Sequence, residues 1–301
     1  MWFRNLLVYR LNADHRIAAE DLESKLSRHA LQPCGSFEME KRGWVCPRGA
    51  DRYLHALERQ WLLALGVNQK LLPAAVVNET VKERAEALAA KQDHPVGRKQ
   101  MREIRERALE ELMPKAFTRR RTTHAWIDPV NRWLVVDTAG EKKAEELLET
   151  LRKAYPDFPA RRLDTERSPA SAMTQWLTAG AVSGDFTLDQ DLELRSADES
   201  QATVRYLRHA LEGKEIRDHI AAGKTATRLG LTWKDRISFV LTEHLQVKRL
   251  VFLDLLKEET AAKAEDPDEQ FDIDFALMSG ELAHLLADLT QALGGEKRRE
   301  S

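Results

Sequence analysis

Residues 115–155 read KAFTRRRTTHAWIDPVNRWLVVDTAGEKKAEELLETLRKAY. Strand-forming residues fill 115–127 and 132–137, and the turn-forming string DPVN stands between them. From about 140 to 155 the apolar residues instead recur every three or four positions, which is the spacing of a helix. A strand pair that leads into a helix, in a chain without strict alternation of strands and helices, predicts an α+β fold.

The chain before this stretch changes character once. Residues 2–11 alternate as a strand does, 17–30 have helical spacing, and 43–72 read as short strands. Residues 74–113 then predict two helices separated by the string DHPVG. We expect these two helices to form a projecting helical hairpin that ends at Pro114.

The chain after this stretch predicts both element types. Residues 158–164 suit a strand, and a loop up to Ser171 leads into a short helix. Residues 213–222 suit another short helix, and 223–256 read as a meander of strands separated by polar turns. The last element is a long helix at about 267–293, which ends at the Gly-Gly pair that follows it.

These elements group into three expected regions. Residues 1–72 and 115–165 form a central α+β region. Residues 73–114 form the projecting helical region. Residues 166–301 form a C-terminal α+β region. A chain of 301 residues is long enough for one large domain or for two to three smaller ones.

Bulk composition does not indicate a nucleic-acid-binding protein. Hydrophobic residues make up 43% of the chain, which is enough to bury a core, and charged residues make up 32%. The charges nearly balance, with 47 Lys and Arg against 49 Asp and Glu. Any affinity for a polyanion must therefore come from where the charges are placed.

Two features predict where the protein resides. The two cysteines, Cys34 and Cys46, are expected to be reduced thiols, because two cysteines make no disulfide framework and no four-ligand metal site. The first residues lack the apolar run of a signal peptide, and no stretch approaches the roughly 20 uncharged apolar residues of a membrane span. We expect a soluble protein of the cytoplasm.

The sequence contains one string that resembles an enzyme motif. Residues 222–225 read AGKT, the end of a phosphate-binding loop, but Asp218 stands where that motif needs its first glycine. We interpret the string as a helix that ends at Gly223, with Lys224 entering a strand. The nine histidines are dispersed, and the chain has no zinc motif and no nucleophile elbow. We predict no catalytic residue, no metal site and no cofactor, and hence a protein that is not an enzyme.

Charge is strongly segregated along the chain. Lys and Arg outnumber Asp and Glu by 12 to 7 in residues 82–121 and by 6 to 3 in residues 204–228. In residues 254–275, nine acids face two lysines. In the helical pair the charges can pair with each other at helical spacing, so most of them are expected to form a solvated surface.

The Arg119-Arg120-Arg121 run is the exception. On a strand, Arg119 and Arg121 point to the side of Phe117, and Arg120 points to the other side. No acid lies between Lys115 and Ala125. Two interpretations remain open from charge alone: a solvated strand, or a strand that faces an acidic partner or the phosphates of a nucleic acid.

Longer strings carry a resemblance to a known family. They occur in order over residues 2–296, and together they resemble the recombination-associated RdgC family. The strings are WFRNLLVYRL, QPCGSFEMEKRGWVCP, LMPKAFTRR, WIDPVNRWLVVDTAGEKKAEELLETLRK, HIAAGKTATRLGLTWKDRISFVL and FALMSGELAHLLADLTQALGGE.

The resemblance implies a fold and a function. It implies a horseshoe-shaped α+β monomer of mixed antiparallel sheets, which pairs with a second copy into a closed ring dimer. The ring has a positively charged hole for double-stranded DNA, and single-stranded DNA is bound too, without sequence preference. The resemblance also implies association with the nucleoid, antagonism of the RecA-type recombinase and no catalytic activity.

The resemblance also implies roles for particular residues. Phe117, with Arg119 beside it, is a candidate dimer contact, and the alternative for Phe117 is an ordinary core aromatic. Lys224 is a candidate cation of the hole, and Arg228, four residues on, is expected to share its strand face. The full set of expected DNA contacts is Arg119, Arg120, Arg121, Arg205, Arg208, His209, Lys224 and Arg228, of which Arg205, Arg208 and His209 rest on charge and position alone.

Two other functions stay open. The acidic residues 254–275 would suit a scaffold that contacts the recombinase directly. The GKT string and the acid clusters would suit an enzyme that acts on DNA, although the spacing of the glycines argues against it.

Overall fold

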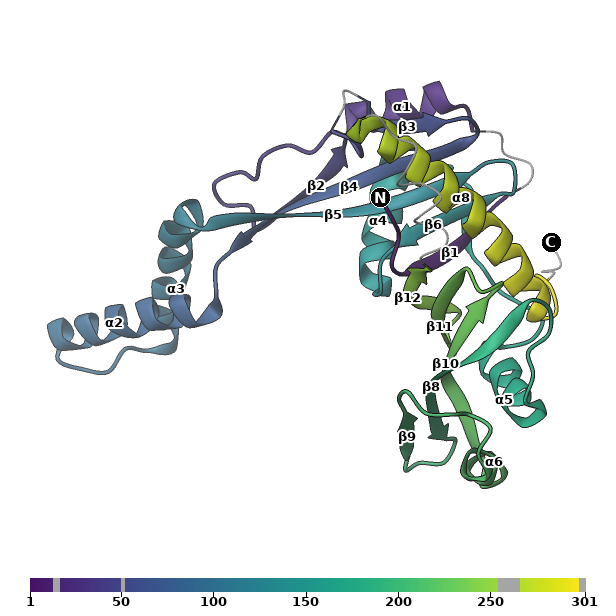
Figure 1. Cartoon of the computed structure of the whole chain (residues 1–301). Helices are drawn as coiled ribbons and strands as arrows, with labels where there is room; N and C mark the ends of the chain where they lie inside the picture. Colours follow the sequence, from purple (N-terminus) through teal and green to yellow (C-terminus); the bar gives the residue numbers. More distant parts are fainter. Residues whose placement is uncertain (13–16, 50–51, 254–265, 298–301) are drawn as a thin grey trace.

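The computed structural model describes residues 1–12, 17–49, 52–253 and 266–297. Their strands form one twelve-stranded sheet of the order β2-β4-β5-β6-β1-β12-β11-β10-β8-β9, with β3 beside β4 and β7 beside β1 (Figure 1). All of the strand pairs are antiparallel. Helices pack on both faces of this sheet, so the predicted α+β class is confirmed.

The elements have the following bounds. The strands are β1 (Leu6–Leu11), β2 (Glu40–Val45), β3 (Leu54–Leu57), β4 (Gln60–Leu71), β5 (Phe117–Asp128), β6 (Trp133–Asp137), β7 (Ala160–Arg162), β8 (Phe186–Ser196), β9 (Thr203–Tyr206), β10 (Lys224–Trp233), β11 (Ile237–Thr242) and β12 (Gln246–Phe252). The helices are α1 (Ala19–Arg28), α2 (Ala74–Gln92), α3 (Arg98–Leu112), α4 (Glu141–Ala154), α5 (Pro169–Ala179), α6 (Lys214–Ala221) and α8 (Pro267–Ala292), and a 3-10 turn η1 covers Met113–Lys115.

Strands β4 and β5 form a long two-stranded ribbon. They pair from Trp61↔Ile127 to Leu71↔Phe117, and Leu62, Leu63, Leu65 and their neighbours are buried because both faces of this end are covered. Helices α1 and α4 cover one face, and α8 covers the other. The ribbon then continues beyond both layers and carries the helical hairpin at its far end (Figure 1).

Helices α2 and α3 form the hairpin that the sequence predicted. The hairpin has a small core of its own, made by Val77, Val81 and Ala108. Asp93 closes α2 in the left-handed region with a φ of 59°. The Nζ of the buried Lys70 donates hydrogen bonds to the carbonyls of Ser36 (2.7 Å) and Met113 (2.8 Å). This ammonium therefore ties the base of the hairpin to the ribbon.

Helix α8 joins the two halves of the molecule. One hydrophobic cluster contains Leu6 and Trp126 from the N-terminal half together with Leu231 and Phe239 from the C-terminal half, and Leu285 of α8 packs among them. Both halves therefore share one hydrophobic core. The expected boundary at residue 165, between a central region and a C-terminal region, stays a prediction. Of the acidic residues 254–275, the part 254–265 lies outside the described residues.

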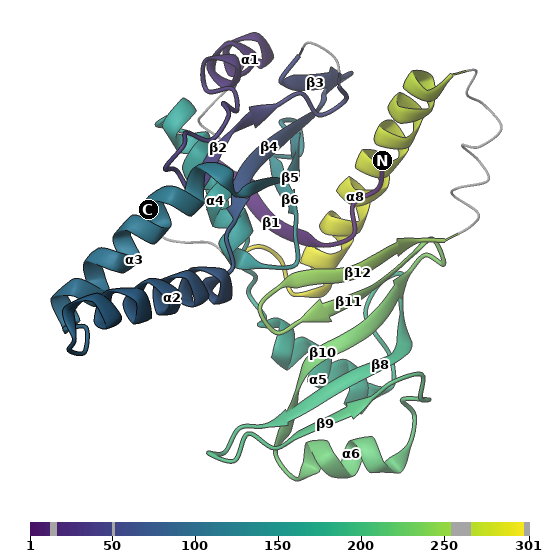
Figure 2. The ribbon, with the colours of Figure 1, turned by 90° about the vertical axis from the view of Figure 1, so that its left-hand side faces the viewer.

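The C-terminal part of the sheet has two different faces. Helix α5 packs against β10, and the side of the sheet that it covers carries Ala226, Leu229 and Leu194. We call the other side of β8–β12 the open face. Pairing places Thr225, Arg228, Val240 and Lys248 on it, and none of the described helices lies across it in Figure 2, where it faces the viewer. The open face is thus turned toward the side on which the hairpin projects.

Lys70→Met tests the tie at the base of the hairpin. The substitution keeps the bulk of the side chain but leaves two carbonyls without their charged donor, so the free energy of unfolding should fall by about 2 kcal/mol. Hydrogen exchange of the amides in 74–112 should become faster as well. Lys82→Met on the exposed side of α2 is the control and should change the unfolding free energy by less than about 0.5 kcal/mol in urea titrations. Equal effects of the two substitutions would contradict the assigned role of Lys70.

Candidate functional site

The structure separates the three arginines of β5. Arg119 and Arg120 are exposed, whereas Arg121 is half-buried. The Nη2 of Arg121 lies 2.6 Å from the Oε2 of Glu146 in α4 and 3.7 Å from the Oε2 of Glu40 in β2. No acid lies within this run, but acids of two other elements neutralise Arg121. Its acids come from other elements, which a search of the neighbouring residues cannot find.

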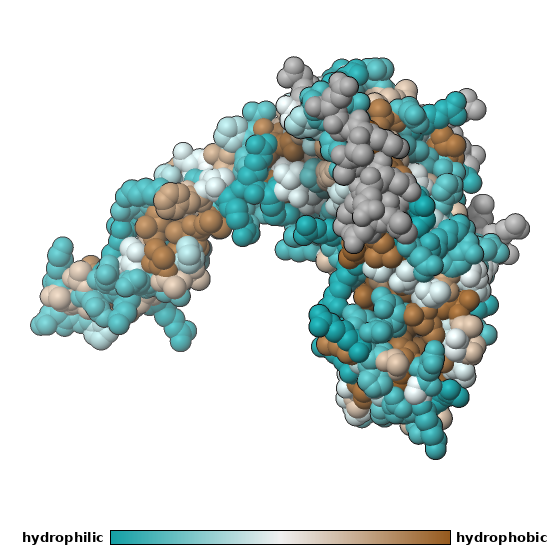
Figure 3. All heavy atoms as spheres, viewed as in Figure 1, coloured by the Kyte–Doolittle hydropathy of each residue, from teal (hydrophilic) through white to brown (hydrophobic). Residues whose placement is uncertain are grey.

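Phe117 lies at the outer end of the ribbon and is 85% exposed. The alternative that it is a core aromatic is therefore wrong in this chain. Its strand partner Leu71 is 45% exposed, and hydrophobic residues gather where the ribbon meets the hairpin (Figure 3). An exposed apolar patch of this kind is typical of a surface that another protein covers.

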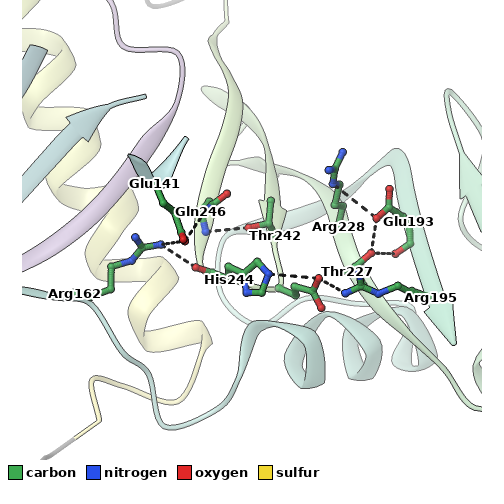
Figure 4. A network of polar contacts seen from close by, with 10 residues as sticks. Glu141, Arg162, Glu193, Arg195, Thr227, Arg228, Thr242, His244 and Gln246 are labelled. Carbon is green, nitrogen blue, oxygen red and sulfur yellow. Dashed lines mark hydrogen bonds and ion pairs between the residues drawn. The ribbon is translucent and has the colours of Figure 1, made fainter. Parts of the chain in front are cut away.

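Arg205 and Arg228 meet on the open face, where both contact Glu193. The Nε of Arg205 donates to Glu193 Oε2 at 2.6 Å. The Nε of Arg228 lies 3.9 Å from Glu193 Oε1, a contact that Figure 4 shows. The hydroxyl of Thr227 donates to Oε1 at 2.8 Å. Burial raises the pKa of Glu193, but the hydrogen bonds from Thr227 and Arg205 and the charge of Arg228 outweigh it and hold the pKa below its usual value. One carboxylate therefore contacts both guanidinium groups.

A pocket of about 330 Å³ opens beside this pair. Lys248 and Arg249 line it, and the Nη1 of Arg249 lies 3.1 Å from the Oδ2 of Asp191. The sequence analysis missed these two cations because the basic segment that it counted ended at residue 228. The adjacent Lys-Arg pair inside a predicted strand was the signal that could have found them.

Arg208 and His209 follow β9 at the edge of the same region. The backbone N–H of Arg208 donates to Asp191 Oδ1 at 3.4 Å, which places the residue next to the pocket. Arg208 is exposed and adopts a φ of 52°. The imidazole of His209 lies beside the ring of Tyr206, with centroids 5.3 Å apart. The structure thus brings Arg205, Arg208 and Arg228 together, whereas the arginine run of β5 lies on the ribbon.

Lys224 and Arg228 do not share a strand face. The pairing Ala226↔Leu194 is followed by Arg228↔Glu193, so a β-bulge at Thr227 inserts one extra residue between them. The bulge reverses the alternation, and Lys224 belongs to the face of Ala226 at the start of β10. The expectation that these two cations point the same way is corrected. That expectation was based on the spacing of four residues between Lys224 and Arg228, and a bulge cannot be recognised from this spacing.

The AGKT string has the local structure that we expected. Helix α6 ends at Ala221, Gly223 adopts a φ of 88°, and β10 begins at Lys224. In the described ranges no group of three or more His, Cys, Asp or Glu side chains could hold a metal ion. None of the helices in these ranges is long and apolar enough to cross a membrane. Asp272 of α8 lies 3.1 Å from both Arg48 and His55.

Two substitutions should separate the arginines of β5. Arg121→Met removes the hydrogen-bonded partner of Glu146, whose side chain is only 8% exposed, so the free energy of unfolding should fall by about 2 kcal/mol. Arg119→Met removes an exposed side chain and should change it by less than about 0.5 kcal/mol. Chemical denaturation of both variants measures the difference. The assignment fails if Arg119→Met is the more destabilising of the two.

Comparison with known proteins gives a consistent result over the full chain. A family model described as "RdgC: Putative exonuclease, RdgC" matches residues 1–296. The recombination-associated protein RdgC of Dechloromonas aromatica (strain RCB) is 52% identical over 299 residues, which cover 98% of each chain. The recombination-associated protein RdgC of Herminiimonas arsenicoxydans is 49% identical over 300 residues, which cover 100% of each chain. That of Janthinobacterium sp. (strain Marseille) is 48% identical with the same coverage.

Proposed function

The chain belongs to the RdgC family of recombination-associated proteins, and from this membership and the placement of its charges we propose that it binds DNA through the sugar–phosphate backbone, without reading base sequence. The observation that carries the proposal is the cluster of cations on and beside the open face. Contacts to phosphates position a protein on DNA but carry no sequence information.

The geometry of the cations supports binding to phosphates. Around the pocket, the four cations Arg205, Arg228, Lys248 and Arg249 stand against the two carboxylates of Asp191 and Glu193. The carboxylates hold arginines in place by hydrogen bonds, so less side-chain freedom is lost when a phosphate binds. The excess of cations leaves a local positive charge in a chain whose net charge is only −2.

Other cations lie outside this cluster. Arg208 borders the pocket, whereas Lys224, at the start of β10, is half-buried and belongs to the face of Ala226. Arg119 and Arg120 lie exposed on the ribbon. None of these four side chains forms an ion pair within the described ranges, so each is available to a polyanion. Arg121 is assigned to the fold instead.

We also propose that the monomer is a horseshoe that closes into a ring dimer with a second copy. The hairpin projects on the side to which the open face is turned (Figures 1 and 2), and we place the DNA between them. Phe117 and Leu71 provide an exposed apolar patch for the contact between copies. A twofold dimer doubles the number of cations that face the DNA. Encircling the duplex keeps individually weak phosphate contacts engaged.

The proposed role in recombination follows from the coverage of DNA by the bound protein. A protein that covers DNA on the nucleoid limits access of the RecA-type recombinase, and this requires no catalysis. Direct contact with the recombinase remains compatible with this role. The description of the family model names an exonuclease, which makes nuclease activity the second candidate function. Incubation with end-labelled linear DNA and Mg²⁺ separates the two, because only an exonuclease releases labelled nucleotides.

DNA affinity and its salt dependence test the proposed binding. If about six phosphates are neutralised, the slope of log K against log salt for duplex DNA should be near −5, and unrelated duplexes should give the same slope. Arg228→Met/Arg249→Met should make the slope less steep by about two, because both arginines line the pocket on the open face and each phosphate contact contributes about one. Arg167→Met, an exposed arginine before α5, is the control. Strong preference for one sequence, or a slope that is independent of both cations, would contradict the proposal.

The dimer is tested by mass in solution. Phe117→Ser should convert a species of about twice 34.4 kDa into one of 34.4 kDa in analytical ultracentrifugation, because it places a hydroxyl in the apolar contact. Val130→Ser, which changes another exposed apolar residue in the turn between β5 and β6, should leave the dimer intact. A wild-type protein that sediments only as a monomer would rule out the ring.

A further inference from the structure

The pocket on the open face has the size and the position of a ligand site. Its volume of about 330 Å³ falls at the small end of the range of ligand pockets, roughly 300–1,000 Å³. It lies where the two halves of the sheet meet, so its walls come from different parts of the chain. They include Asn5 before β1, Ala139 before α4, and residues of β8, β10, β11 and β12.

One cation of the pocket is not compensated. Arg205 and Arg228 contact Glu193, and Arg249 contacts Asp191. The side chain of Lys248 is half-buried, and its Nζ forms no hydrogen bond or ion pair with the described part of the chain. Burial and the nearby charge of Arg228 lower the pKa of Lys248, and Glu141 opposes them only in part. An anion bound at this ammonium would relieve both unfavourable effects.

The pocket also has an apolar part. Leu192 is buried, Val240 is half-buried, and Leu207 is 65% exposed although it borders the cations. An apolar surface next to an uncompensated cation matches a ligand that has both a negative group and a flat apolar body. Inorganic phosphate alone would leave the side chain of Leu207 exposed to water.

We propose that this pocket binds one unpaired nucleotide, with its phosphate at Lys248 and its base against Leu207 and Val240. The proposal rests on the DNA binding proposed above and deepens it. A duplex presents its phosphates but keeps its bases stacked, whereas a single strand can offer both parts together. The shared chemistry is a nucleoside monophosphate unit, which either a single strand or a free nucleotide supplies.

The test compares two single strands in fluorescence anisotropy titrations with the full-length protein. One is an oligothymidylate, and the other is an abasic strand of the same length, which has phosphates but no bases. The wild type should prefer the oligothymidylate by about fivefold, since contact with a base contributes on the order of 1–3 kcal/mol. Leu207→Ser should remove most of this preference without changing the affinity for the abasic strand.

Lys248→Met should act on both strands. It should weaken each about equally and make the salt slope less steep by about one, as expected for the loss of one phosphate contact. Lys297→Met, which changes an exposed lysine outside the pocket, is the control. If Lys248→Met lowers the thermal midpoint, Lys248→Gln provides the same test in a more polar side chain.

Competition with thymidine 5′-monophosphate identifies the source of the nucleotide. Displacement of the strand from the wild type but not from Lys248→Met assigns the pocket to free nucleotide, and no displacement assigns it to a strand. Equal affinity of the wild type for both strands would overturn the proposal, as would unchanged binding by Leu207→Ser and Lys248→Met. In that case the proposed binding of duplex DNA would still stand. If the protein bound no DNA of any kind, the proposed function itself would be contradicted.

Discussion

The structure depends on the pairing of β1 with β6 on one side and with β12 on the other. The pair Leu7↔Gln246 lies on the side of α4, and the pair Leu6↔Val247 lies on the side of α8. Because side chains alternate along a strand, a slip of one residue would exchange the two faces. This register therefore decides that Lys248, two residues after Gln246, lies on the open face. A hydrogen bond of 3.0 Å from Gln246 to Glu141 of α4 fixes the same junction (Figure 4).

The near-zero net charge is compatible with a site for polyanions because the acids have a positioning role. Glu146 holds Arg121 in the ribbon, and Glu193 holds Arg205 and Arg228 on the open face. Such pairs cancel in a count of charges, yet they decide where each guanidinium points. The cations that form no ion pair with the described residues, such as Lys248, then determine the local potential. Binding follows from this arrangement rather than from total charge.

The sequence predicted local structure well because local structure has a period. The hairpin of α2 and α3, the strand pair of β5 and β6 and the long helix α8 all follow from the spacing of apolar residues. The candidate site was predicted less completely. The ion pair between Arg121 and Glu146 joins residues distant in sequence, and the bulge at Thr227 changes a face without changing the spacing. Lys248 and Arg249 become visible as a site only when β12 is placed beside β11.

Photo-crosslinking tests the claim that the open face contacts DNA. It compares one position on this face with one position on the helix that covers the opposite face. Thr225 lies exposed on the open face, and Thr178 lies exposed on α5, which covers the opposite face. A photoreactive amino acid at Thr225 should crosslink to bound duplex DNA, and the same amino acid at Thr178 should not. Crosslinking from Thr178 in the absence of crosslinking from Thr225 would contradict the account.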